Sequence, residues 1–67
     1  MKKTEIKSFV SKQWGFKTNQ ITLLETSTHY GELDYVMFEV CGIQYQARKE
    51  MASFGHQLWD FEIYKPF

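Results

Sequence analysis

Residues 33–50 read LDYVMFEVCGIQYQARKE, and this stretch decides the fold because two alternating runs of apolar residues flank the pair Cys41-Gly42. Glycine at the second position of a two-residue hairpin loop suits the positive φ that a type I′ turn requires, although cysteine at the first position is unusual. The pattern therefore predicts a β-hairpin in which residues 33–41 form one strand and residues 43–50 form the next.

A loop made of Cys41 and Gly42 would determine which residues of the two strands face each other, and a bulged turn would shift the partners. One face then holds the pairs Val40–Ile43, Phe38–Tyr45, Val36–Ala47 and, at the open end, the oppositely charged Asp34–Lys49. The opposite face holds Glu39–Gln44, Met37–Gln46, Tyr35–Arg48 and Leu33–Glu50. We expect the first face to point into the core and the second to point outward.

Upstream of the hairpin, residues 3–14 place Ile6, Phe9, Val10 and Trp14 on one helical stripe. Glu5 lies favourably in the first turn, and Gly15 follows where a glycine often ends a helix. We expect a helix that packs its stripe on the sheet. Residues 20–28 are rich in Ile, Thr and Leu and predict a first strand, followed by a loop over residues 29–32.

The C-terminal part has two interpretations. Trp59, Phe61 and Ile63 alternate with Asp60 and Glu62 over residues 58–64, which is typical of a strand. A helical spacing also connects Ala47, Met51, Phe54, Leu58 and Phe61, but Gly55 interrupts it. We favour the strand, with residues 51–56 as the connection that leads into it.

Together these elements predict one α+β domain over residues 1–67, with an N-terminal helix packed on one face of a three- to four-stranded antiparallel β-meander (α-β-β-β-β). One cysteine allows no internal disulfide, so stability must come from the core, from self-association or from a partner. The expected core consists of Ile6, Phe9, Val10, Trp14, Val36, Phe38, Val40, Ile43, Tyr45, Trp59 and Phe61.

Charge and composition narrow the function classes. Eight basic residues balance eight acidic residues, which argues against dedicated nucleic-acid binding and makes a homodimer easier to form. No apolar run follows the basic N-terminus and no segment is long enough to span a membrane, so we expect a cytoplasmic protein, as the lone cysteine also indicates. The preference for lysine over arginine indicates a bacterial or phage genome rich in AT.

No motif for phosphate binding, dinucleotide binding or nucleophilic catalysis is present. Cys41, His29 and His56 are the only soft metal ligands or nucleophiles, and they lack the paired short spacings of a structural zinc site. A small sheet with one helix also offers little room for a substrate pocket. We therefore expect no enzymatic activity, no cofactor, no metal and no small-molecule substrate.

The outward face is the most informative feature for function. One short helix covers only one side of a sheet, and Tyr, Met and Arg are enriched in protein interfaces. Our hypothesis is a small protein-binding module, an inhibitor or adaptor that acts by surface contact, with a homodimer as an expected variant. Its expected partner-binding residues are Leu33, Tyr35, Met37, Gln46, Arg48, Tyr64 and Phe67.

Three alternatives stay open. The outward face could be an ordinary semi-polar solvent surface on which Tyr35 stacks against Arg48. It could instead bind single- or double-stranded nucleic acid through Tyr35, Tyr45, Arg48 and Lys49, since aromatic side chains on sheets stack with bases. At the C-terminal end, Tyr64 and Phe67 could fold back over the core rather than contact a partner.

Overall fold

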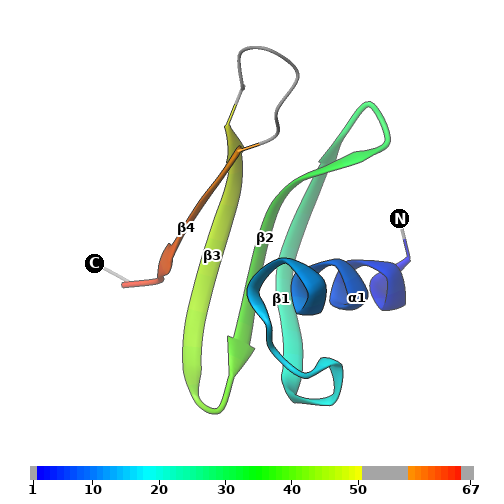
Figure 1. Cartoon of the computed structure of the whole chain (residues 1–67). Coiled ribbons are helices and arrows are strands. Elements are labelled where there is room, and N and C mark those ends of the chain that lie inside the picture. Colours follow the sequence, from blue (N-terminus) through cyan, green and yellow to red (C-terminus); the bar gives the residue numbers. More distant parts are fainter. Residues whose placement is uncertain (1, 51–57, 66–67) are drawn as a thin grey trace.

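The computed structural model describes residues 2–50 and 58–65. Its elements are the helix α1 (Lys3–Trp14), the short 3-10 helix η1 (Thr18–Gln20) and the strands β1 (Ile21–His29), β2 (Glu32–Val40), β3 (Ile43–Glu50) and β4 (Leu58–Ile63). The strands form one antiparallel sheet in the order β1-β2-β3-β4, and α1 lies across one face of it (Figure 1). The predicted α+β arrangement is confirmed. None of the helices in the described part has the length and apolar character needed to cross a membrane.

α1 forms over residues 3–14, as its apolar stripe predicts. Ile6 and Val10 lie one turn apart on this stripe, and both are buried against the sheet. Glu5 in the first turn and Lys12 in the last turn complement the helix dipole. Gly15 adopts the left-handed conformation (φ 80°), and its N–H donates a 2.8 Å hydrogen bond to the carbonyl oxygen of Ser11. The predicted end of the helix is therefore confirmed.

Two-residue turns join the first three strands. Cys41 and Gly42 have φ angles of 52° and 82°, and Tyr30 and Gly31 have φ angles of 52° and 78°. Positive φ at both central residues is what a type I′ turn requires, and the twist of this turn matches the twist of the flanking strands. The predicted Cys41-Gly42 turn is confirmed. The first loop is shorter than predicted, because the residues on either side of Tyr30 and Gly31 pair with each other as strand ends.

The pairing of β2 with β3 follows from the second turn. On the helix side, Val40 lies opposite Ile43, Phe38 opposite Tyr45 and Val36 opposite Ala47, and on the other side Glu39 lies opposite Gln44, Met37 opposite Gln46 and Tyr35 opposite Arg48. These six predicted pairs are confirmed. The helical alternative is wrong where the structure describes the chain, because residues 47–50 belong to β3 and residues 58–61 belong to β4. The predicted connection over 51–56 lies outside the described residues.

β2 departs from the predicted alternation near its start. In its pairing with β1, Tyr35 lies opposite Ser27 but Leu33 lies opposite Thr28, so Asp34 is an extra residue in a β-bulge. The bulge turns Leu33 to the helix side, where it is buried in the core. The predicted outward position of Leu33 is therefore wrong.

The charge pair predicted at the open end of the hairpin is also different in the structure. Lys49 Nζ lies 3.1 Å from Glu32 Oε2 instead of binding Asp34. The bulge explains the exchange of partners, since the regular pairing of β2 with β3 does not extend beyond Tyr35 and Arg48. The pair contributes little to stability, because the Glu32 side chain is largely exposed.

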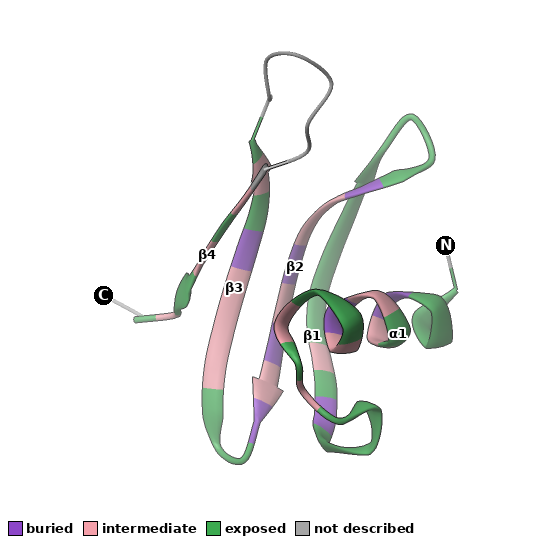
Figure 2. Ribbon diagram, viewed as in Figure 1, coloured by how far each residue is buried: buried purple, intermediate pink, exposed green. Residues whose placement is uncertain are grey.

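The buried core lies along β2, beneath α1 (Figure 2). Within the described part of the chain it consists of Ile6, Val10, Ile21, Leu33, Val36, Phe38, Val40 and Ala47. Aromatic rings extend this core toward β4: the Phe61 ring stacks on Trp14 with centroids 4.9 Å apart and on Tyr45 with centroids 5.5 Å apart. The predicted core residues Phe9, Trp14, Tyr45, Trp59 and Phe61 are half-buried against it.

One predicted core residue, Ile43, is 45% exposed. Its partner Val40 is buried and lies on the same face of the sheet. The predicted face of Ile43 is therefore correct, but its predicted burial is wrong, because α1 does not extend over it. α1 lies over β1 and β2 (Figure 1). Within the described residues, aromatic rings rather than a second α-helix cover the helix-side face of β3 and β4. Ile63 is 56% exposed for the same reason. Phe16, which is not among the predicted core residues, packs against the buried core.

The turn makes a direct prediction about stability. Cys41→Asn should stabilise the protein by about 0.5 kcal/mol, since Asn tolerates the left-handed conformation better than Cys. Gly42→Ala should destabilise it by about 1–2 kcal/mol. The cost is conformational, because no atom lies within 4 Å of the added Cβ. Urea unfolding followed by circular dichroism measures both changes. Cys41→Ala is the control, and equal stability of the Asn and Ala variants would contradict the expected turn preference.

Candidate docking face on the sheet

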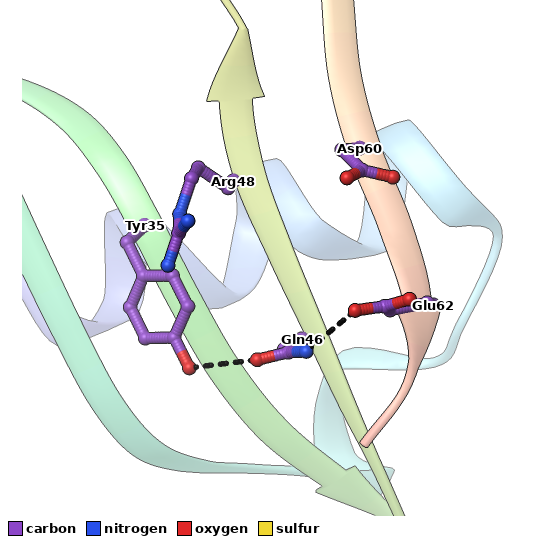
Figure 3. Close-up of a pocket in the computed structure, with 5 residues that line it drawn as sticks. All are labelled: Tyr35, Gln46, Arg48, Asp60 and Glu62. Atoms are coloured by element: carbon purple, nitrogen blue, oxygen red, sulfur yellow. Dashed lines mark hydrogen bonds between the residues drawn. The ribbon is translucent and has the colours of Figure 1, made fainter. Parts of the chain in front are cut away.

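The face of the sheet opposite α1 has no other described element packed against it. Because the strands are in register, its side chains form rows across β2, β3 and β4: Met37, Gln46 and Glu62 form one row, and Tyr35, Arg48 and Asp60 form the next. In Figure 3 the labelled members of these rows lie on the side of the sheet away from the helix. We call the two rows, together with the neighbouring Glu25, Glu39, Gln44 and Glu50, the outer face.

One hydrogen bond connects the two rows, and a second runs along one of them. The Tyr35 hydroxyl donates to Gln46 Oε1 over 3.2 Å, and Gln46 Nε2 donates to Glu62 Oε1 over 2.7 Å (Figure 3). The amide of Gln46 is thereby held in one orientation by a donor on β2 and an acceptor on β4. Side chains from three strands thus form an ordered polar strip across the outer face.

Arg48 lies beside this strip. Its guanidinium carbon is 5.8 Å from the centroid of the Tyr35 ring, within the range of a cation–π contact. Tyr35 and Arg48 are also directly opposite each other on β2 and β3, so the contact follows from the hairpin register. The contact between Tyr35 and Arg48 that the solvent-surface alternative described is therefore present.

The electrostatic environment of Tyr35 is asymmetric. Burial among its neighbours raises the pKa of the phenol, the charge of Glu25 on β1 raises it further, and Arg48 opposes both effects. Tyr64 adds a smaller upward contribution to the same pKa. Two residues that the sequence did not link, one before the hairpin and one after β4, therefore act on the centre of the outer face.

The outer face contains shallow hollows. One of about 70 Å³ lies between Tyr35, Gln46, Arg48, Asp60 and Glu62 (Figure 3). This is well below the ~300–1,000 Å³ of typical small-molecule sites. A larger depression of about 400 Å³ adjoins it, lined by Gln46, Glu62, Ile63 and Lys65. The first hollow is therefore smaller than such sites, whereas the volume of the second lies within their range.

The metal and nucleophile candidates from the sequence are not gathered into a site in the described part of the chain. Cys41 is an exposed free cysteine in the turn. The His29 ring packs against Tyr30 with centroids 4.4 Å apart, at the other hairpin turn. His56 lies outside the described residues. No group of three or more His, Cys, Asp or Glu residues within 2–50 and 58–65 is arranged to hold a metal ion.

The expected partner-binding residues divide into four groups. Tyr35, Met37, Gln46 and Arg48 lie together on the outer face, whereas Leu33 is buried because of the bulge. Tyr64 continues along β3 beyond β4, since its N–H donates a 2.9 Å hydrogen bond to the carbonyl oxygen of Gln44. Phe67 lies outside the described residues.

Sequence reasoning did not assign Glu25, Asp60 and Glu62 to the site. The alternation in residues 58–64 does separate Asp60 and Glu62 from the aromatic residues, and this was the available signal. Their positions opposite Arg48 and Gln46 depend on the β3–β4 register, which no turn residue in the sequence specifies. Glu25 comes to the outer face only because of an irregularity after Leu23 in β1.

Comparisons of the chain with known protein families, with curated proteins and with solved structures found no match.

Tyr35 makes a prediction that can be measured by titration. Its pKa should lie above the ordinary value of about 10. Glu25→Gln should lower this pKa, and Arg48→Gln should raise it. Because the folded state holds the phenolic proton more tightly than the unfolded state, the resulting stability is complete below pH ~10 and is lost as the pH rises through the folded pKa.

The titration can be followed by the ¹³C chemical shift of Tyr35 Cζ, assigned with Tyr35→Phe. Glu5→Gln on α1 is the control and should leave the Tyr35 pKa unchanged. A Tyr35 that titrates below pH 10, or that does not respond to Glu25→Gln, would contradict the described environment.

Proposed function

We propose that this chain is a small non-enzymatic protein-binding module, an inhibitor or adaptor that acts by placing the outer face of its sheet on a larger protein. The observation that supports this proposal most strongly is the ordered strip at the centre of that face. There, Tyr35, Gln46 and Glu62 are connected by hydrogen bonds across three strands (Figure 3). Among the described elements, the helix α1 lies on the opposite side of the sheet (Figure 1).

Pre-organisation is the physical reason why this strip favours binding. A flexible side chain loses rotamer entropy of about 0.5–1.5 kcal/mol when an interface immobilises it. Gln46 and Tyr35 are already held by hydrogen bonds, and Tyr35 also contacts Arg48, so a partner would find these groups in place. Tyr and Arg are also the residue types that most often dominate binding energy at interfaces.

The nucleic-acid alternative receives less support from the geometry. Tyr35 and Arg48 lie on the outer face, but Tyr45 lies on the helix side, where its ring stacks on Phe38 with centroids 5.5 Å apart. Lys49 is engaged with Glu32. The four residues therefore do not form one platform on which bases could stack.

The proposal retains a bacterial or phage origin and a cytoplasmic location, where a lone exposed cysteine such as Cys41 stays reduced. Inhibitors and adaptors of this size act by occupying a surface, and they require neither a substrate pocket nor a cofactor.

Affinity purification of the tagged protein from its native cell tests the proposal, followed by affinity measurement with the purified partner. The double variant Tyr35→Ala/Met37→Ala should weaken binding by at least 30-fold, which corresponds to about 2 kcal/mol at an interface centre. The control Lys3→Ala/Lys12→Ala changes two exposed residues of α1 and should bind as the unchanged protein does.

Circular dichroism must show that both double variants remain folded. Full binding by Tyr35→Ala/Met37→Ala would contradict a docking role for the outer face. So would an equal loss of binding in the α1 control, because the contact would then lie on the helix side or cover the whole molecule.

A further inference from the structure

The net charge of zero conceals a strong separation of charge along the chain. Residues 1–20 contain five lysines and one glutamate, which gives this segment a net charge of +4. Residues 21–67 contain seven acidic residues and three basic residues, Arg48, Lys49 and Lys65, which gives this segment a net charge of −4. The helices α1 and η1 lie in the first segment, and the four described strands of the sheet lie in the second. The folded molecule thus has a basic helix layer and an acidic sheet.

Most of the acidic excess lies on the outer face. Five carboxylates belong to it: Glu25, Glu39, Glu50, Asp60 and Glu62. Arg48 is the cation within this face, and Lys65 lies beside Glu62 at its rim, so an excess of three negative charges remains. Lys49 does not reduce this excess, because it points to the helix side and binds Glu32.

These carboxylates are not neutralised within the described structure. Across residues 2–50 and 58–65, Lys49–Glu32 is the single salt bridge within 4 Å. Asp60 lies directly opposite Arg48, yet the guanidinium lies over the Tyr35 ring instead (Figure 3). The contact with the ring shows that this part of the face accommodates a guanidinium. Although Glu62 Oε1 accepts a hydrogen bond from Gln46, no carboxylate of the outer face forms a salt bridge within the described residues, so further cations can bind to them.

Charge complementarity selects among the possible occupants of this face. A second copy placed face to face would bring two acidic surfaces together, which is unfavourable. Nucleic acid would be repelled for the same reason. A surface with lysine and arginine side chains would find carboxylates around an aromatic and amide centre, and arginine can contact both kinds of group.

We propose that the outer face docks a lysine- and arginine-rich protein surface, with the carboxylates around the Tyr35–Gln46–Glu62 strip as its counter-charges. This inference rests on the proposed function and adds the chemistry of the partner. Opposite charges also accelerate association and make it sensitive to salt, because exposed charges are screened over about 8 Å at physiological ionic strength.

The test uses the ¹⁵N-labelled full chain and a deca-arginine peptide as the probe. At 20 mM NaCl, amide shifts should concentrate on β2, β3 and β4, and the affinity should fall at least tenfold in 200 mM NaCl. The variant Glu25→Gln/Asp60→Asn/Glu62→Gln should lose at least tenfold in affinity. The matched control Glu5→Gln/Glu32→Gln/Asp34→Asn changes the net charge equally and should lose less than threefold.

The same two triple variants, tested on the partner captured above, separate the two proposals. The inference is supported if the outer-face triple variant loses binding to that partner and the matched triple variant retains it. If the triple retains the partner while Tyr35→Ala/Met37→Ala loses it, the docking face stands and the cationic partner is refuted. Equal peptide binding by both triples would also refute it.

Two further measurements address the other occupants. Sedimentation at 200 μM and low salt should show a monomer. An assembly that the outer-face triple abolishes would assign the face to the basic helix layer of a second copy and overturn the proposal. Binding of a single-stranded oligonucleotide that shifts the outer-face amides would overturn it as well.

Discussion

The register between β2 and β3 is the constraint on which the rest of the structure depends. Side chains alternate between the two faces of a strand, so a slip by one residue would exchange the core face and the outer face. The two residues of the Cys41-Gly42 turn prevent such a slip, because both adopt positive φ and leave Val40 and Ile43 as the first pair. From this pair onward, the core residues of the hairpin and the members of the outer face are determined together.

The core that results is small and depends on aromatic rings at its margin. A domain of this size buries only about 60% of the surface that its unfolded chain exposes. Here α1 buries Ile6 and Val10 over β1 and β2, and the rings of Trp14, Tyr45 and Phe61 close the remaining space over β3 and β4. The helix occupies one side of the sheet, which leaves the other side to polar side chains. In the part of the chain that the structure describes, the open outer face is therefore a direct consequence of having one α-helix.

The parts of the structure that local signals specify could be predicted from the sequence. The helix over residues 3–14 follows from its stripe and from Gly15, and the pairs of the central hairpin follow from its turn. The errors occur where tertiary context decides. A bulge at Asp34 reverses Leu33, and the lateral position of α1 leaves Ile43 exposed. Predicting the hydrogen bond from Gln46 to Glu62 requires knowledge of the β3–β4 register, and the sequence offers no comparable turn signal for that register.

The proposed docking face combines an ordered centre with an asymmetric distribution of charge. The centre depends on Tyr35, Gln46 and Glu62 lying on one face, and the charge asymmetry depends on the same alternation along β2, β3 and β4. The measurement that tests this basis most directly is a nuclear Overhauser spectrum of the folded protein. Contacts between backbone protons of Met37 and Gln46, and between those of Tyr35 and Arg48, are expected from the register. If Met37 instead contacts Tyr45 or Ala47, the register has slipped by one residue. Such a slip would place Tyr35 on the helix side of the sheet and would contradict the account.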